Sequence, residues 1–319
     1  MIATMSPWRR IISGAALFVT VIATATVPVT QRFNLNDGSD QLWSPREVDL
    51  TDGTVLQSFA FDNAHHYIYT VQVTDGSSAT TGNLTVTKLS WDGQTVVGFM
   101  YLTGFGHGVQ IGVESSGSDA YLWTEVDAVS DGTNAWGNKL GRFKFVSGTT
   151  LAHTSSSIAK YSLVAGADRT TCNVDMANGY LIMRYRVSGS FRFALYNLAS
   201  VKAGGTTALC DIAQPSGLGT FQGFTSYGSF MYVLTGDAYN TSTNPSPGDT
   251  FITILNLNDG TQTDRQQTNA GTTLTYREPE GMAVYSSGST RRLCFGFATQ
   301  VTSGNRLACV YYKDALIAP

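Results

Sequence analysis

Three residues with side chains suited to acid–base or anion chemistry stand out in this sequence. His107 lies in the open loop Gly104–Gly108, and its imidazole titrates near neutral pH. Glu280 lies in Arg277-Glu278-Pro279-Glu280-Gly281 and could act as an acid, a cation ligand or an internal ion-pair partner. Arg184 could bind a ligand carboxylate or phosphate, or pair with Glu125. We take His107, Arg184 and Glu280 as candidate catalytic residues, with a purely structural role as the alternative for each.

Repeated strand patterns would position these side chains. A polar residue, a small residue and alternating apolar residues recur near positions 57, 107, 171, 222 and 280, and a very apolar strand follows each time. The repeats are about 56 residues apart, and four antiparallel strands per repeat are typical of a propeller blade. We therefore predict an all-β, five-bladed β-propeller, with a two-sheet sandwich or jelly roll as the alternative.

The last repeat has room for only three strands, the third of them at Arg306–Tyr312. An N-terminal strand near Arg46–Leu50 could supply the fourth strand. Such a strand would close the ring and remove an exposed edge.

One axial mouth should collect the polar residues. The first strand of each repeat, if innermost, begins there, and the second strand returns to the same face because it is antiparallel. Convergent polar groups in a concave site suggest ligand binding. The predicted binding residues are Gln57, Gln72, Glu125, Gln222 and Arg277.

The N-terminus reads as a secretory signal over residues 1–25, with Arg9 and Arg10, an apolar stretch from Ile11 to Ile22 and a small-residue cleavage site. A membrane anchor is the alternative, although the apolar stretch is short of the roughly 20 residues that a span needs. Residues 26–319 would then form a single propeller domain. We expect a secreted protein, monomeric, without integral membrane association.

Composition and motifs exclude several function classes. The chain has 20 Lys and Arg against 23 Asp and Glu, so a nucleic-acid footprint is not expected. Nucleophile-elbow, zinc-protease, P-loop and dinucleotide motifs are absent from the sequence. We therefore expect no cofactor and no metal. Among the four cysteines, only Cys294 and Cys309 could form a disulfide within one blade.

Several motifs together resemble a known propeller family. They are Phe59–Asp62, Gly104–Gly108 followed by Ile111–Glu114, Tyr121–Glu125, and Arg277–Gly281. They stand in the same order near the blade starts of the family that includes helveticin-type bacteriocins, teichoic acid biosynthesis protein C and some phage receptor-binding proteins. The resemblance covers most of residues 45–315. It implies a five-bladed propeller associated with bacterial envelope glycopolymers.

Two functions follow from these observations. The first is a secreted, bacteriocin-like protein that recognises a cell-envelope or extracellular glycan, either teichoic-acid-like or an acidic polysaccharide. The second is a polysaccharide lyase acting on a uronate glycan, with His107 as base or acid, Arg184 as carboxylate neutraliser and Tyr185 or another tyrosine as acid. The chain is also similar in outline to secreted propeller lyases, typically seven-bladed, and this resemblance implies rhamnose–glucuronate as the substrate. Hydrolysis by Glu125 and Glu280 is a third, weaker alternative.

Overall fold

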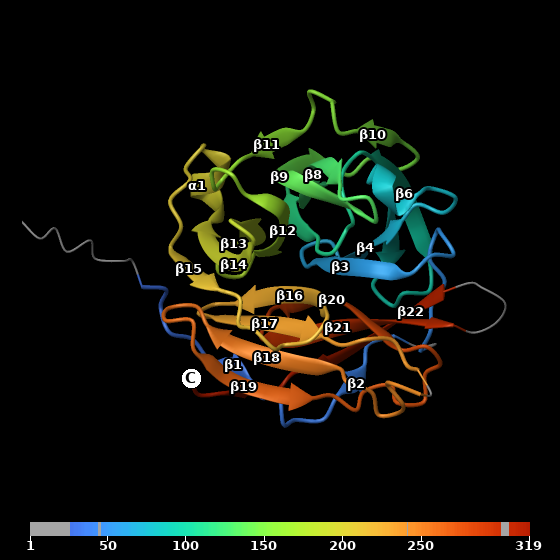
Figure 1. Ribbon diagram of the computed structural model, residues 1–319, viewed down its shortest axis with the longest axis vertical. Helices are drawn as coiled ribbons and strands as arrows, with labels where there is room; N and C mark the ends of the chain where they lie inside the picture. Colours follow the sequence, from blue (N-terminus) through green and yellow to red (C-terminus); the bar gives the residue numbers. More distant parts are fainter. Residues whose placement is uncertain (1–25, 44–45, 241, 301–305) are drawn as a thin grey trace, which may run out of the picture.

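The computed structural model describes residues 26–43, 46–240, 242–300 and 306–319. The predicted signal peptide, residues 1–25, lies outside this range. Five antiparallel sheets surround one axis, so the predicted five-bladed propeller is confirmed and the sandwich alternative is wrong (Figure 1). Within the described residues, no helix has the length and apolar character needed to cross a membrane.

Each blade runs from an innermost to an outermost strand. Blade 1 comprises β3 (Leu56–Asp62), β4 (Tyr67–Val73), β5 (Leu84–Ser90) and β6 (Val96–Thr103). Blade 2 comprises β7 (Gly112–Ser116), β8 (Asp119–Ser130), β9 (Ala135–Lys144) and β11 (Ala159–Tyr161). Blade 3 comprises β12 (Asp168–Asp175), β13 (Tyr180–Val187), β14 (Ser190–Asn197) and β15 (Cys210–Ala213). Blade 4 comprises β16 (Phe221–Tyr227), β17 (Phe230–Thr235), β18 (Phe251–Asn256) and β19 (Gln262–Gln267).

Blade 5 contains both ends of the propeller. Its strands β20 (Glu278–Ser287), β21 (Thr290–Gln300) and β22 (Arg306–Lys313) come from the C-terminal part of the chain, and β2 (Asp40–Gln41) pairs with β22. Val48 also exchanges two backbone hydrogen bonds of 2.9 Å with Ala308. The predicted closure by an N-terminal segment is therefore confirmed. A second pairing, between β1 (Arg32–Phe33) and β23 (Leu316–Ile317), adds to it.

Short elements extend this framework. The strand β10 (Thr150–Ala152) lies between β9 and β11 of blade 2 in the chain but pairs in parallel with β6, which links the outer edges of blades 1 and 2. A 3-10 helix, η1 (Ala79–Thr81), lies between β4 and β5, and a short helix, α1 (Leu198–Lys202), lies between β14 and β15. The start of β7 at Gly112 falls five residues after the predicted repeat start, because the segment before it forms a loop.

The hydrophobic core consists of five clusters, one at each boundary between adjacent blades. Successive side chains of a strand point to opposite faces of its sheet. In β13, Leu181 and Met183 pack against blade 2, whereas Ile182 packs against blade 4. Cys294 and Cys309 likewise belong to different clusters, on opposite faces of blade 5, so the one disulfide considered from the sequence does not form.

Candidate functional site

A pocket of about 380 Å³ opens at the mouth face, the end of the propeller where the innermost strands begin. Four residues predicted for this mouth line it together: Gln57, His107, Gln222 and Glu280. They come from four different blades, as expected for residues at equivalent starting positions. The other lining residues are Val55, Val109, Trp136, Thr220, Phe221 and Glu278.

An aromatic stack forms one wall of this pocket. Trp136 follows the turn between β8 and β9, which brings it back to the mouth face. Its ring lies 5.0 Å from the His107 ring, and the guanidinium of Arg169 lies 4.8 Å from its ring centre. The Trp136 indole N–H donates to Asp131 at 2.7 Å, so the ring is held at its polar edge as well.

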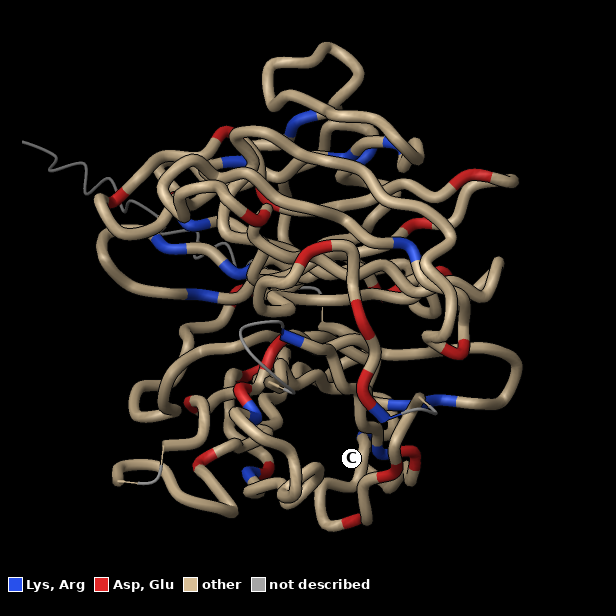
Figure 2. Tube along the Cα trace, turned by 90° about the vertical axis from the view of Figure 1, so that its right-hand side faces the viewer, with Lys and Arg blue, Asp and Glu red and all other residues tan. Residues whose placement is uncertain are grey.

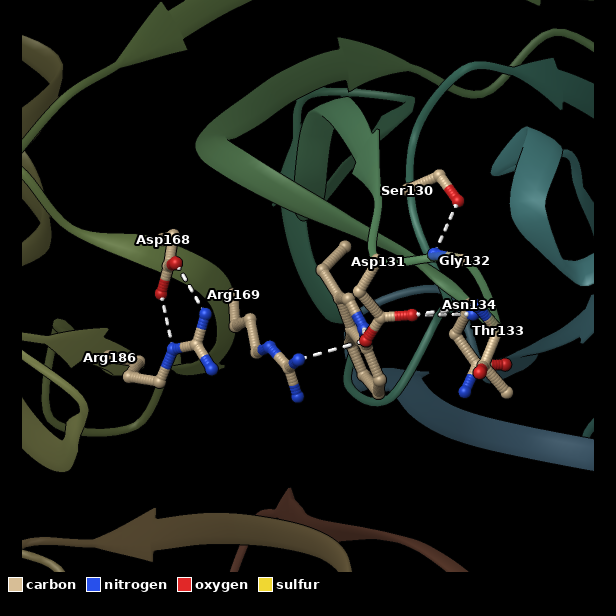
Figure 3. A network of polar contacts seen from close by, with 9 residues as sticks. Ser130, Asp131, Gly132, Thr133, Asn134, Asp168, Arg169 and Arg186 are labelled. Atoms are coloured by element: carbon tan, nitrogen blue, oxygen red, sulfur yellow. Dashed lines mark hydrogen bonds and ion pairs between the residues drawn. The ribbon is translucent and has the colours of Figure 1, made fainter.

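The arginines beside this stack are paired with carboxylates (Figure 3). Arg169 donates to Asp131 at 2.8 Å, and Arg186 donates two hydrogen bonds to Asp168, of 2.8 and 2.6 Å. Asp131 also accepts the backbone N–H groups of Thr133 and Asn134. This network fixes the turn before Trp136 and neutralises the nearby positive charges.

Two carboxyl groups line the opposite part of the pocket. Glu278 and Glu280 are two residues apart in β20, and Glu280 is only 5% exposed. Burial, with a smaller contribution from Glu278, raises the pKa of Glu280 well above its usual range. Burial also lowers the pKa of His107 to about 4. The pocket therefore presents an imidazole that is neutral at neutral pH beside a carboxyl group that keeps its proton to a higher pH than an exposed glutamate.

The base of the pocket is closed by close contacts between inner strands. A Cβ atom on Gly223 would lie 2.8 Å from the Cα of Gly281, and one on Gly281 would lie 2.7 Å from the Cα of Ser58. Gln110 fills the centre, since its amide donates to Met282 O at 2.7 Å and accepts the N–H of Phe224. A ligand would thus enter a blind pocket rather than an open channel.

Glu125 supports the pocket from behind. One of its oxygens accepts the N–H groups of His107 at 3.0 Å and Gly108 at 2.7 Å, and the other accepts the N–H of Gly137 at 2.6 Å. Glu125 was predicted to bind a ligand at the mouth. Its side chain instead accepts hydrogen bonds from the backbone, which is a structural role. Burial raises its pKa to about 7, although these N–H groups oppose the shift.

Three further predicted residues lie away from the pocket. Gln72 is buried and donates to the backbone carbonyls of Asp52 and Thr54. Arg184 is enclosed between the rings of Phe191 and Phe221, at 3.7 and 3.8 Å, behind the pocket wall. Arg277 is fully buried and donates to carbonyl oxygens in the loop before β20. Each side chain is held by contacts outside the pocket.

The other residues considered for this face are also engaged elsewhere. Tyr185, the possible acid of a lyase, donates to Asp211 on β15, the outermost strand of blade 3, at 2.7 Å. Thr171 donates to Gln110 O below the pocket. Trp123 is buried, and its indole N–H donates to Glu114.

Trp136 is the site residue that the sequence reading missed. It lies at the start of the third strand of its repeat, whereas the residues predicted for the mouth come from the first two strands of each repeat or from just before them. The preceding Asp131-Gly132 turn is the signal that could have located it, because the second strand runs toward the mouth face and the hairpin at its end therefore lies there.

Comparison with known proteins agrees with this architecture. The family model described as the phage 5-bladed beta propeller receptor binding platform domain matches residues 55–312. The chain belongs to this family. It is 30% identical over 278 residues to teichoic acid biosynthesis protein C of Bacillus subtilis (strain 168), a match that covers 83% of this chain and 60% of that protein.

A solved structure shows the same fold. The tail fiber of Staphylococcus aureus phage P68 aligns with a TM-score of 0.68 at 18% identity, over 88% of this chain and 54% of the fiber chain. The chain therefore spans little more than half the length of each of these two relatives.

Proposed function

We propose that this propeller acts outside the cell and recognises a cell-envelope or extracellular glycan, teichoic-acid-like or another acidic polysaccharide, through its mouth pocket. The proposal depends chiefly on Trp136, a half-buried aromatic ring beside hydrogen-bonding side chains. Aromatic faces pack against the apolar faces of sugar rings, and the amides of Gln57 and Gln222 can both donate to and accept from hydroxyl groups. Kinship with a receptor-binding family and with teichoic acid biosynthesis protein C supports this class of ligand.

The pocket geometry favours binding over β-elimination. A lyase needs a base and a cation on the same substrate unit. His107 lines the pocket, but Arg184 is enclosed between two phenylalanine rings. Nor does any Lys or Arg line the pocket within the described part of the chain. Charges of both signs are interspersed along the chain in the view of Figure 2.

Binding to bacterial cell walls tests the proposal. Sedimentation with walls that retain teichoic acid, compared with walls stripped of it, measures binding and its dependence on the polymer. Trp136→Ala should weaken binding at least tenfold, which corresponds to about 1.4 kcal/mol. Trp91→Ala is the matched control. Trp91 is also half-buried, but it follows β5 at the end of blade 1 that lies away from the mouth face.

Equal binding by a folded Trp136→Ala variant and the wild type would place the site elsewhere. Absorbance from unsaturated products with uronate polysaccharides, lost in His107→Ala, would instead establish the lyase.

A further inference from the structure

A second pocket lies on the mouth face, between two loops of blades 4 and 5. Its volume is about 510 Å³, and its larger lining side chains are Tyr239, Pro245, Leu274 and Tyr276. The first loop joins the end of β17 to the start of β18, and the second joins the end of β19 to the start of β20. Both loops lie at the mouth face, because β16 and β20 begin there and their neighbouring strands are antiparallel.

The second pocket is joined directly to the mouth pocket. Tyr276, which lines the second pocket, makes a side-chain hydrogen bond with Glu278, which lines the mouth pocket. Tyr276 and Arg277 have φ values of 69° and 41°, a left-handed conformation that non-glycine residues seldom adopt. Their neighbours fix this conformation. The Arg277 guanidinium donates to the carbonyls of Ala270 and Thr268, at 2.9 and 2.8 Å.

The two pockets differ in charge. Glu278 disfavours an anionic group in the mouth pocket, and the cations nearest to Trp136 are paired with carboxylates (Figure 3). Beside the second pocket, the guanidinium of Arg306 lies 3.5 Å from the ring centre of Tyr276. Arg306 donates to the amide oxygen of Gln300 and forms no ion pair with a carboxylate in the parts of the chain that the structure describes.

We propose that the second pocket is a subsite for the continuation of the same glycan. The mouth pocket holds a hydroxyl-bearing unit against Trp136. The chain then passes over Tyr276, the next unit packs against Tyr276 and Tyr239, and its acidic group lies beside Arg306. This inference depends on the proposed function, and it specifies the ligand as an anionic polymer that occupies two adjoining pockets.

Hydrogen exchange of the wild-type protein tests the subsite without any substitution. The probes are soluble teichoic acid released from Bacillus subtilis walls and N-acetylglucosamine as a single uncharged sugar. The polymer should protect the loops of both pockets, including residues 272–276. The monosaccharide, at saturating concentration, should protect only segments of the mouth pocket, such as 107–109 and 220–222.

Two variants add a charge-specific readout. Arg306→Gln should weaken polymer binding about five- to tenfold at low salt and reduce its salt dependence, while monosaccharide binding stays unchanged. Arg291→Gln is the control, because Arg291 is a similarly half-buried arginine at the opposite end of blade 5. Tyr239→Ala should also weaken binding of the polymer alone, whereas Tyr239→Phe should retain it.

The outcomes separate the two proposals. Polymer protection confined to the mouth pocket, or equal effects of Arg306→Gln and Arg291→Gln, would overturn the subsite and leave the mouth site intact. Protection of neither pocket would overturn the proposed function itself.

Discussion

Replacement of Glu125 tests how the mouth pocket is held in shape. In Glu125→Ala, three backbone N–H groups lose their acceptor: those of His107, Gly108 and Gly137. A buried donor left without a partner costs about 1–3 kcal/mol. Water can enter the space vacated by the side chain, so we expect the lower half of the combined range of about 3–9 kcal/mol, which is about 3–6 kcal/mol.

Glu125→Gln should cost less, because its amide oxygen can still accept the N–H groups of His107 and Gly108. Its NH₂ group would then face the N–H of Gly137, which leaves these two donors without an acceptor, at a cost of about 1–3 kcal/mol each. The order of stability should therefore be wild type, Glu125→Gln, Glu125→Ala.

Thermal unfolding and cell-wall binding measure the two consequences. Glu125→Ala should lower the Tm by roughly 6–24 °C, given a shift of about 2–4 °C per kcal/mol in a domain of this size. It should also weaken glycan binding in the fraction that stays folded, because the loop that carries His107 loses its anchor. A Glu125→Ala protein with wild-type stability and binding would refute this account of the pocket.

The remaining predictions concern closure and two titrating groups. Deletion of residues 31–50 should abolish cooperative unfolding, as seen by circular dichroism, because β22 loses its partners β2 and Val48; unchanged thermal stability would contradict closure. His65 donates to Asp62 and contacts Gly117 O, and the hydrogen bond to Asp62 raises the pKa of His65 in the folded protein. The stabilisation from protonated His65 is therefore present below pH 6.5, the pKa of the unfolded chain, and is lost as the pH rises through the higher pKa of the folded protein. The Tm gap between wild type and His65→Gln should therefore shrink on going from pH 5.5 to pH 8.5, and a constant gap would refute the link. Burial raises the pKa of Glu280, so the wild type should lose stability as the pH rises above about 4.5, and Glu280→Gln should lose less over the same range; thermal scans in which both proteins follow the same pH profile would show that Glu280 ionises freely.

The fold could be predicted because each sequence repeat corresponds to one blade. Alternating apolar residues, turn signals and a fixed spacing define four-stranded units, and the short last repeat implies closure by the N-terminus. The positions of Gln57, His107, Gln222 and Glu280 followed from the same periodicity, since equivalent positions in a ring of blades converge at one face.

The roles of Glu125, Arg184 and Arg277 could not be predicted in this way. The strand register places each of them near the mouth face, but whether a side chain faces a pocket or the backbone depends on local packing. Arg184 is withdrawn by two phenylalanine rings, one from β14 and one from β16 of the next blade. Such contacts join segments far apart in the chain, so the pattern of residues within one strand does not predict them.

A structure of the propeller in complex with a teichoic acid fragment would test the central claim most directly. The account predicts that a sugar ring lies against Trp136 in the mouth pocket, with its hydroxyl groups bonded to Gln57, Gln222 or Glu280. A fragment bound on the side of a blade or on the opposite face, with the mouth pocket empty, would contradict it.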